Sequence, residues 1–464
     1  MTRLRPVFAL YVLVVGLALH NLLMSLLWRA GVQGAALTAI SAWKEILLAA
    51  ALALVVASRR RLPLPAAPAD WLALAFGALV VVYGLLPQVW LGGAATHKGV
   101  LYAARHDLFP VAAYFLGRGL DLTERERTVL CRVVLATAAV VAVYGLVDVY
   151  AVPLSWWRGS AGWYRHQLGL DYGVGLSHLP ENFVYNEGNG VVFRRLTSTF
   201  LSPLASSYLL VFALFFVPLR HRWGIPLALL LLAAVLWSHT RAALIALVAG
   251  LLVLAVVRRA WRPLGYAVVV AAVGLAFVKA YDQFAPRTHF TATELHQQEE
   301  NAKQHPQVSN DPTAANESST REHLASLRDG ARAVVEHPWG YGLGNSGVTA
   351  VRTHVKVEAG ESTYTELGVE TGLIGGLVFV AWSLVLLRGM LRSRPWLGAA
   401  LAAVLVLGLQ TDVIGVPWLA VVVWSLTGDA NGGCRPRGPG RSALRDRARR
   451  RARPPRTPRA SRPV

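Results

Sequence analysis

The sequence predicts an all-α, polytopic membrane protein with about twelve transmembrane helices and one large extracytoplasmic loop. Hydrophobic residues make up 54% of the chain, more than the roughly 45–50% apolar share of soluble globular domains. Apolar windows of about 17–25 residues, long enough as helices to cross a hydrocarbon core, recur from end to end. The main exception is the mostly polar stretch between Tyr281 and Gly360. We therefore expect a helical bundle with one long hydrophilic segment outside the membrane.

The apolar windows place the spans along the chain to within a few residues. The first window is too long for the hydrophobic region of a signal peptide, and no small-residue cleavage site follows it. We therefore expect it to be retained as a signal anchor. The predicted spans are Val7–Trp28, Gln33–Ser58, Trp71–Leu91, Val100–Leu116, Thr128–Ala151, Leu196–Val217, Ile225–Trp237, Ala242–Val257, Leu264–Ala280, Thr365–Leu387, Leu397–Thr411 and Val413–Leu426.

Basic residues predict the orientation of these spans. Short cytoplasmic loops are rich in Lys and Arg, whereas translocated loops are poor in them. Basic clusters such as Arg59-Arg60-Arg61 fall on one side of the predicted bundle, and Arg29 and Lys98 are the exceptions on the other side. Both termini are then cytoplasmic. The two longest loops, residues 153–195 and 281–360, face the other compartment.

The chain divides into a membrane domain, residues 1–428, and a tail, residues 429–464. From Asn431 onward the tail carries twelve Arg against one Asp, which is more than half of the formal charge of +20. Pro and Gly interrupt these charges, so we expect a disordered cytoplasmic tail attracted to anionic membrane lipid. The charge therefore does not indicate a nucleic-acid partner. Cys131 and Cys434 both fall on the cytoplasmic side and predict no disulfide.

The long polar loop has two parts of different character. Residues 291–319 are rich in Gln, Asn, Glu and Ser, and we expect them to be mobile. In residues 320–336, apolar side chains recur at helical spacing, which predicts an amphipathic helix with Ser318 or Ser319 as its N-cap. The turn-rich segment His337–Asn345 ends this helix. We expect the helix to lie on the membrane face or over the bundle.

Two arginines, Arg195 and Arg241, lie on the side that the topology rule keeps poor in Arg. The guanidinium fork matches phosphate oxygens and stays charged at any working pH, so both residues are candidates for holding a diphosphate. Insertion of Arg near a helix centre costs roughly 2.5–3.5 kcal/mol, and less near the interface, which argues for a role. The alternative is that both side chains only extend to the outer headgroups.

Four short segments on this side form a set of motifs. The segments are Arg-Leu-Thr-Ser-Thr-Phe-Leu-Ser-Pro (195–203), Ser-His-Thr-Arg-Ala-Ala (238–243), His-Pro-Trp-Gly-Tyr-Gly-Leu-Gly-Asn (337–345) and Glu-Ser-Thr-Tyr-Thr-Glu-Leu-Gly-Val-Glu-Thr-Gly-Leu-Ile-Gly (361–375). Together they resemble the O-antigen ligase and O-antigen polymerase superfamily of bacterial inner-membrane glycan transferases. The resemblance extends over residues 1–428 in motif order, loop placement and number of spans.

The resemblance implies a transferase that works on the periplasmic side of the bacterial inner membrane without metal or cofactor. Its donor would be an undecaprenyl-diphosphate-linked oligosaccharide, and its acceptor a second glycan or lipid A-core. Arg195, Arg241 and Arg321 would hold the donor diphosphate, which is the leaving group. The sequence itself has no Walker loop, dinucleotide glycine motif or zinc spacing.

The chain departs from the ligases of this superfamily at one motif. Ligases usually carry His-Asn where this chain has Glu361-Ser362, and that His is the proposed base or acceptor-orienting group. The Glu-Ser form resembles the polymerase branch more, so we favour polymerisation over ligation. Glu361 is then the candidate base, with His354 as a nearby substitute. The alternative is that Glu361 only caps the helix that follows it.

Aromatic and ionisable residues add weaker candidates. Trp157 and Trp163 suit stacking on sugar rings, although anchoring at the membrane interface explains them equally well. Ionisable residues within membrane spans are functional candidates by default, but pairing of Lys44 or Arg105 with a carboxylate on a facing helix is an equal alternative. The ionisable residues in predicted spans are Lys44, Glu45, Arg105, His106, Asp107, Asp148 and Asp412.

Two other functions compete with glycan transfer. A polysaccharide or lipid transporter, or flippase, is favoured by the number of spans and by the membrane carboxylates. It is disfavoured because the sequence lacks the internal repeat from which many transporters are built, and because Arg residues flank the large outer loop. A non-catalytic assembly partner is the third possibility.

Overall fold

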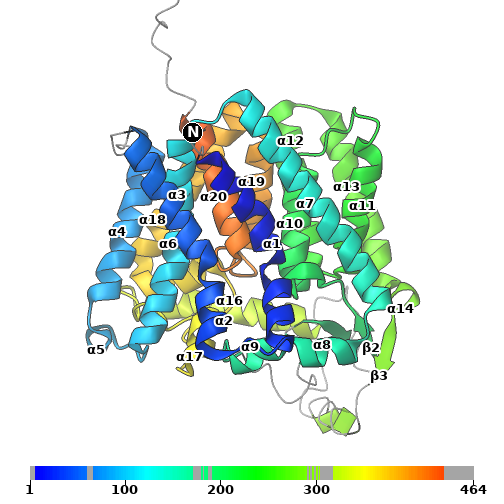
Figure 1. Cartoon of the computed structure of the whole chain (residues 1–464), viewed down its shortest axis with the longest axis horizontal. Helices are drawn as coiled ribbons and strands as arrows, with labels where there is room; N and C mark the ends of the chain where they lie inside the picture. Colours follow the sequence, from blue (N-terminus) through cyan, green and yellow to red (C-terminus); the bar gives the residue numbers. More distant parts are fainter. Residues whose placement is uncertain are drawn as a thin grey trace, which may run out of the picture.

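Helices dominate the structure, a computed structural model, and the long ones run side by side as a bundle (Figure 1). The structure describes residues 6–59, 66–170, 179–180, 182–186, 191–289, 292, 295–296, 299–300, 303 and 317–432. The helices are α1 (Val7–Arg29), α2 (Gly34–Ser41), α3 (Trp43–Arg59), α4 (Pro68–Leu85), α5 (Gln88–Leu91), α6 (His97–Leu120), α7 (Glu124–Ala151), α8 (Leu154–Ser160), α9 (Gly162–His166), η2 (Ser198–Phe200), α10 (Pro203–Leu214), α11 (Gly224–Trp237), α12 (Arg241–Arg258), α13 (Trp261–Lys279), α14 (Tyr281–Phe284), α16 (Ser318–Glu336), α17 (Gly347–Thr353), α18 (Thr363–Ser393), α19 (Pro395–Leu407) and α20 (Pro417–Gly432).

Seven helical segments in the described residues are long and apolar enough to cross a membrane. They are Val7–Arg29, Gly34–Ser58, Pro68–Leu85, Glu124–Ala151, Arg241–Arg258, Trp261–Lys279 and Thr363–Ser393. Three further apolar helices, α10, α11 and α19, are shorter. The predicted helical membrane protein is confirmed in this coarser form, whereas the number of twelve spans stays a prediction. Helix α6 shows why the spans are hard to count. It has 24 residues, but Arg105, His106 and Asp107 interrupt its apolar sequence.

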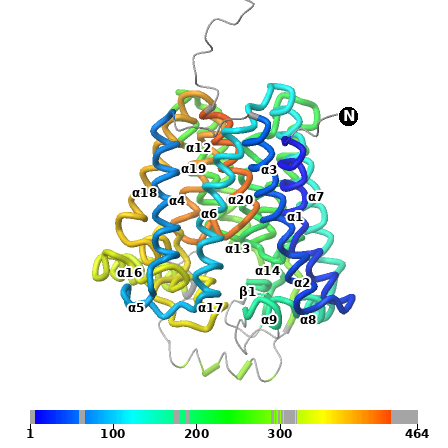
Figure 2. Tube along the Cα trace, turned by 60° about the vertical axis from the view of Figure 1, so that its left-hand side comes forward, coloured from blue at the N-terminus to red at the C-terminus, as the bar shows by residue number. Residues whose placement is uncertain are grey.

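The short elements gather at one end of the bundle, which we call the loop face. It carries α5, α8, α9, α14, α17 and the strands, with α16 at its side (Figures 1 and 2). At the opposite end, the start of α1 and the last turn of α20 both meet the start of α7. Tyr11 Oη donates to the Glu126 carbonyl oxygen at 3.2 Å, and Arg127 Nε donates to Asp429 Oδ2 at 2.7 Å. The start of α1 and the end of α20 therefore lie at the same end of the bundle, and the compartment that each end meets stays a prediction.

The end of α20 shortens the predicted tail. Asp429 is 2% exposed and pairs with Arg127, and the helix continues to Gly432. Residues 429–432 are therefore helical, where the sequence predicted disorder. The remainder of the tail, 433–464, lies outside the described residues.

The predicted amphipathic helix of the long loop is present as α16. Its N-cap is Glu317, whose side chain accepts a hydrogen bond from the Thr320 backbone N–H at 2.9 Å. The prediction of Ser318 or Ser319 as N-cap was wrong, because the Glu317 carboxylate, one position earlier, accepts the hydrogen bond from the Thr320 amide. Most of the polar stretch before the helix, within 291–316, lies outside the described residues.

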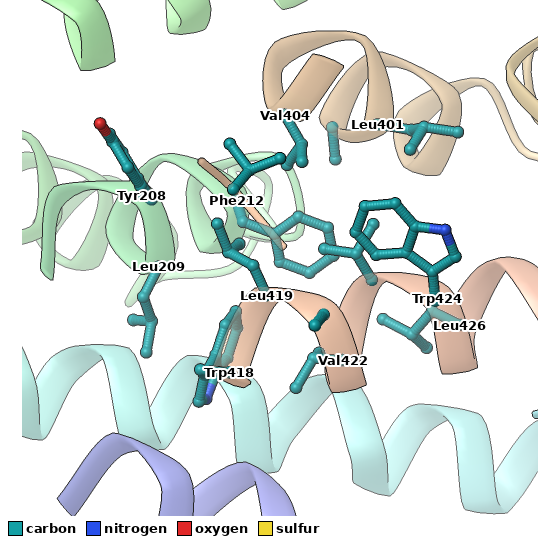
Figure 3. Packing of buried hydrophobic residues seen from close by; sticks show 14 of the residues in the cluster. Tyr208, Leu209, Phe212, Leu401, Val404, Trp418, Leu419, Val422, Trp424 and Leu426 are labelled. Carbon is teal, nitrogen blue, oxygen red and sulfur yellow. The ribbon is translucent and has the colours of Figure 1, made fainter. Parts of the chain in front are cut away.

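The centre of the bundle is packed with aromatic and aliphatic side chains from α10, α19 and α20 (Figure 3). Phe212 on α10 meets Trp418 on α20 edge to face, with ring centroids 5.9 Å apart. Helices α6 and α20 approach so closely that a Cβ at Gly117 would overlap the Ser425 carbonyl oxygen. Small residues at a helix crossing permit this close backbone contact. Tightly packed helices therefore support the loop face.

Several ionisable side chains inside the bundle are paired. Arg105 on α6 lies 3.3 Å from Glu45 on α3, and Lys44 lies 3.5 Å from the same carboxylate. The predicted pairing of Arg105 with a carboxylate on a facing helix is confirmed. Asp70 on α4 pairs with Arg118 on α6 at 2.7 Å. This pair compensates the Asp70 charge, which would be costly to bury without a partner.

A small sheet on the loop face departs from the all-α prediction. Its antiparallel strands β1 (Val184–Asn186), β2 (Val191–Arg194) and β3 (Arg287–His289) are ordered β1-β2-β3. Strand β2 belongs to the first long loop and β3 to the second, so the sheet joins the two loops. Strands of three or four residues carry too little alternation to be distinguished from loops by sequence.

Candidate functional site

Arg195 follows β2 and directs its guanidinium at the turn between α11 and α12. Its Nε donates to the Ser238 carbonyl oxygen at 2.9 Å. Its Nη2 donates to the His239 carbonyl oxygen at 3.3 Å and to Thr240 Oγ1 at 3.2 Å. The side chain is buried, and burial lowers the pKa of the guanidinium to about 10. These contacts give Arg195 a packing role, and its contact with a diphosphate stays a prediction.

The preceding arginine, Arg194, is held in a sealed ion pair. Its Nη2 lies 3.0 Å from Asp148 Oδ2, and the two side chains are 3% and 0% exposed. The guanidinium also lies 4.9 Å from the centre of the Phe183 ring. Successive side chains of an extended segment point to opposite sides, so these neighbouring arginines reach different partners.

The turn that Arg195 holds is a strained and buried one. His239 has a positive φ of 48°, which is uncommon for a residue with a side chain. Its ring lies between two tyrosines, with centroids 4.3 Å from Tyr185 and 4.1 Å from Tyr281. Burial, followed by the charges of Arg195 and Arg241, lowers the pKa of His239 well below its usual value. Burial therefore favours the neutral form of the His239 ring, which packs against both tyrosines.

Arg241 is the first residue of α12 and is linked to the start of α16. Its Nη2 lies 2.8 Å from Glu317 Oε2, and the side chains are 25% and 6% exposed. The same carboxylate oxygen accepts from the Thr320 backbone N–H at 2.9 Å. Arg241 thus stands at the positive end of a helix dipole in a pair that remains partly open to solvent.

Helix α16 lies against the beginning of α18 on the loop face (Figure 2). Ser326 Oγ donates to the Gly360 carbonyl oxygen at 3.3 Å. Further along, the Val334 side chain packs on Gly368, where a Cβ would overlap it. Val334 is buried, as expected for the apolar face of an amphipathic helix. These contacts place α16 over the segment that contains Glu361.

His323 on α16 forms an ion pair with Glu361, through Nδ1 and Oε2. The two side chains are 35% and 44% exposed, so the pair is accessible from the loop face. The hydrogen bond to Glu361 raises the pKa of His323 above its usual value, against a smaller opposing effect of burial. The sequence did not single out His323.

The backbone at Glu361 is fixed by the connection between α19 and α20. Glu361 has a positive φ of 63°, a strained value for a non-glycine residue. Next to it, Ser362 Oγ donates to the Gly408 carbonyl oxygen at 3.1 Å, and Thr363 Oγ1 donates to the Thr411 carbonyl oxygen at 3.1 Å. The N-cap of α18 is Ser362, so Glu361 does not occupy the capping position that the alternative interpretation required.

Arg321, the third predicted diphosphate ligand, is exposed on α16. It lines a surface hollow of about 640 Å³ formed by side chains of this helix. In the described residues it has no recorded contact with Arg195 or Arg241, so its place at a diphosphate stays a prediction. The lining residues are Arg321, Leu324, Ala325, Arg328, Asp329 and Arg332.

A family model described as O-antigen ligase matches residues 226–380. These residues are similar to that family, and we refer to residues 226–380 as the O-antigen ligase domain. The domain extends from α11 into α18, and it contains Arg241, His323 and Glu361 but not Arg195. The predicted superfamily is thereby confirmed, and the match supports glycan transfer of the O-antigen ligase and polymerase type. No curated protein matches the chain.

The two tryptophans predicted to bind sugar lie before the O-antigen ligase domain and are buried. Trp157 is 0% exposed and donates through Nε1 to Asp148 Oδ1 at 2.7 Å. Trp163 is 3% exposed and donates through Nε1 to Ser25 Oγ at 2.8 Å. Both rings are packed against protein, so stacking on a sugar stays a prediction that would need them to be uncovered.

His354 lies at the C-terminal end of α17, within the O-antigen ligase domain. It adopts a left-handed backbone conformation, with φ 55°, that ends the helix. Its Nε2 would lie 3.8 Å from a Cβ at Gly169, which belongs to the first long loop. No contact between His354 and Glu361 is recorded among the described residues, so the structure does not bring the two predicted catalytic residues together.

A largely buried group of ionisable side chains joins α6 and the connection between α19 and α20 to α18 of the O-antigen ligase domain. His106 Nδ1 lies 2.7 Å from Asp107 Oδ1, and His106 Nε2 lies 2.6 Å from Asp412 Oδ2. Glu370 on α18 accepts from the Ser346 hydroxyl at 3.0 Å, and Glu366, one turn earlier, is also buried. The sequence indicated His106, Asp107 and Asp412 separately. Glu366 and Glu370 could also have been identified from the sequence, because two glutamates one turn apart in an apolar helix are functional candidates.

Proposed function

We propose that this chain polymerises undecaprenyl-diphosphate-linked glycan units on the periplasmic face of the bacterial inner membrane. The acceptor is a second glycan unit in a polymerase and lipid A-core in a ligase, and we favour the polymerase because of the Glu361-Ser362 motif. The domain match supports the general reaction. The identity of the donor, the acceptor and the compartment rests on the resemblance and on the distribution of charge.

One observation carries this proposal: α16 links the candidate phosphate ligand to the candidate acid–base residue. Glu317 contacts Arg241, and His323 contacts Glu361. Along an α-helix, Glu317 and His323 are separated by a rise of roughly 9 Å. This spacing leaves room for a sugar between a diphosphate at Arg241 and a hydroxyl at Glu361.

The chemistry needs positive charge where the leaving group develops negative charge. The acceptor hydroxyl oxygen forms a bond to the anomeric carbon while the bond from that carbon to the diphosphate oxygen breaks. The bonding electrons leave with undecaprenyl diphosphate, and a fixed guanidinium stabilises that charge without reorganisation. Arg241 suits this role because its side chain is 25% exposed and pairs with the Glu317 carboxylate, for which a diphosphate of higher charge can compete.

The decisive test uses the purified full chain in lipid with undecaprenyl-diphosphate-linked repeat units as the only substrate. A ladder of products supports a polymerase, and a product that requires added lipid A-core supports a ligase. Arg241→Ala should lower the rate of formation of either product by about 10²–10³-fold. The matched control is Arg258→Ala, an exposed arginine at the opposite end of α12. Wild-type protein that yields no transfer with either acceptor would overturn the proposal.

A lipid or polysaccharide transporter is the second candidate function, and the buried ionisable group favours it. Histidine and carboxylates inside a bundle are typical of proton relays in transporters, and His106 lies between two carboxylates. Vesicles loaded with fluorescent lipid-linked oligosaccharide distinguish the two candidates. Movement across the bilayer that depends on a proton gradient, without chain growth, supports transport.

A further inference from the structure

The Glu361 carboxylate is contacted by an imidazole from a different element, His323 of α16. Both side chains are partly exposed, at 35% for His323 and 44% for Glu361. We propose that His323 is the general base of the transfer reaction and that Glu361 is the carboxylate that orients it. The inference rests on the proposed function and assigns the proton transfer within the same site.

The geometry assigns different tasks to the two ring nitrogens of His323. Nδ1 faces Glu361 Oε2, and a carboxylate on one ring nitrogen fixes the tautomer and the ring orientation. Nε2 then carries the lone pair. No hydrogen bond to Nε2 is recorded within the described part of the chain, and the side chain is about one-third exposed. The free nitrogen is therefore accessible to an acceptor hydroxyl.

The other histidines of this region have different surroundings. His337 Nε2 makes a hydrogen bond of 2.9 Å with the Leu91 carbonyl oxygen, and its ring stacks on Tyr341 at 4.1 Å. His354 ends α17 and has no recorded carboxylate partner among the described residues. His323 differs from both because it contacts a carboxylate, that of Glu361. It also lies on the helix whose Glu317 contacts Arg241.

Three neighbouring charges act on the proton affinity of His323. The hydrogen bond and charge of Glu361 raise its pKa, and so does Glu322, whereas burial and Arg241 lower it. The net effect is a pKa above the usual value, which makes His323 a stronger base that must first lose its own proton. The reaction rate should therefore rise with pH through the pKa of His323.

The proton balance of the step is complete without a cofactor. The acceptor hydroxyl gives its proton to His323 Nε2 as its oxygen bonds to the anomeric carbon. The resulting imidazolium is stabilised by Glu361, in the way that a carboxylate stabilises a histidine base in other transferases and hydrolases. Undecaprenyl diphosphate leaves with the bonding electrons, and the imidazolium returns its proton to water before the next transfer.

The test compares His323→Gln with Glu361→Gln in the full chain in lipid. We expect His323→Gln to lower the transfer rate by about 10²–10⁴-fold, the usual contribution of a general base, with little change in KM for the donor. Glu361→Gln should lower the rate less and move the acid limb of the pH profile to lower pH, because the main cause of the raised His323 pKa is removed. The matched control is His221→Gln, an exposed histidine between α10 and α11.

Two further measurements separate catalysis from folding. His323→Ala should recover part of its rate with added imidazole, and each variant should keep its thermal unfolding midpoint. Transfer by His323→Gln at the wild-type rate would overturn the assignment, and so would a lower rate with an unshifted pH profile for Glu361→Gln. Absence of transfer by the wild-type protein refutes the proposed function instead, so the two failures are distinguishable.

Discussion

Two arginine–carboxylate pairs on the loop face differ in their access to solvent. Arg194 and Asp148 are 3% and 0% exposed, whereas Arg241 and Glu317 are 25% and 6% exposed. Charges removed from water must keep their partner, because an uncompensated buried charge is very costly. A partly exposed pair can exchange its partner at little cost. We therefore expect Arg194 to stabilise the fold, and we expect Arg241 to be the better candidate for contact with a ligand.

Asp148→Asn tests the sealed pair and should have the largest effect. It leaves the Arg194 charge without a counter-charge, and loss of one partner of a buried pair costs about 3–5 kcal/mol of unfolding free energy. Unfolding of the detergent-solubilised protein measures this, with Glu317→Gln as the matched control. Equal stability of the two variants would show that the pairs do not differ as described.

Arg241→Ala tests the open pair through activity. We expect the transfer rate to fall by about 10²–10³-fold, as for removal of one group that stabilises developing negative charge, with an unchanged unfolding midpoint. Arg241→Lys should not restore the rate if the guanidinium contacts phosphate through two nitrogens. The length and yield of glycan chains made by membranes or purified protein provide the measurement. Full-length polymer from Arg241→Ala would contradict the role of this arginine.

Arg195→Lys tests an arginine that is buried like Arg194 but has no carboxylate among its recorded partners in the described residues. The side chain is buried, but its recorded partners are neutral oxygen atoms of the Ser238–Thr240 turn. Buried acceptors left without a donor cost about 1–3 kcal/mol, so stability and transfer should fall together because the turn precedes Arg241. Thermal unfolding and glycan synthesis are measured on the same preparation. A stable variant without activity would instead support direct contact of Arg195 with the diphosphate.

Glu317→Gln should produce the smallest change. A partly exposed ion pair contributes about 0–1 kcal/mol, and glutamine can still cap α16. Because Glu317 competes with a diphosphate for Arg241, its neutralisation should lower the KM for the donor by a few fold. Steady-state kinetics with varied donor concentration measures this effect. A higher KM would indicate that the carboxylate helps to hold Arg241 in its working position.

The sequence by itself determined the nearly all-helical membrane fold, the amphipathic α16 and the superfamily. These features depend on local patterns, because hydrophobic length predicts a span and helical spacing predicts an amphipathic face. It also indicated the pairing of Arg105, since an unpaired charge inside a membrane is costly. It did not indicate the small sheet, whose strands are too short to carry an alternating pattern.

The tertiary structure alone decided which of these residues meet. His323 reaches Glu361, and His106 reaches Asp412, because helices that are distant in sequence pack side by side. Periodicity identifies the face of a helix but not the residue that will lie opposite it. The same limit applies to Arg194 and Arg195, which are adjacent in sequence. One enters a sealed ion pair and the other holds a turn, because extended backbone directs successive side chains to opposite sides.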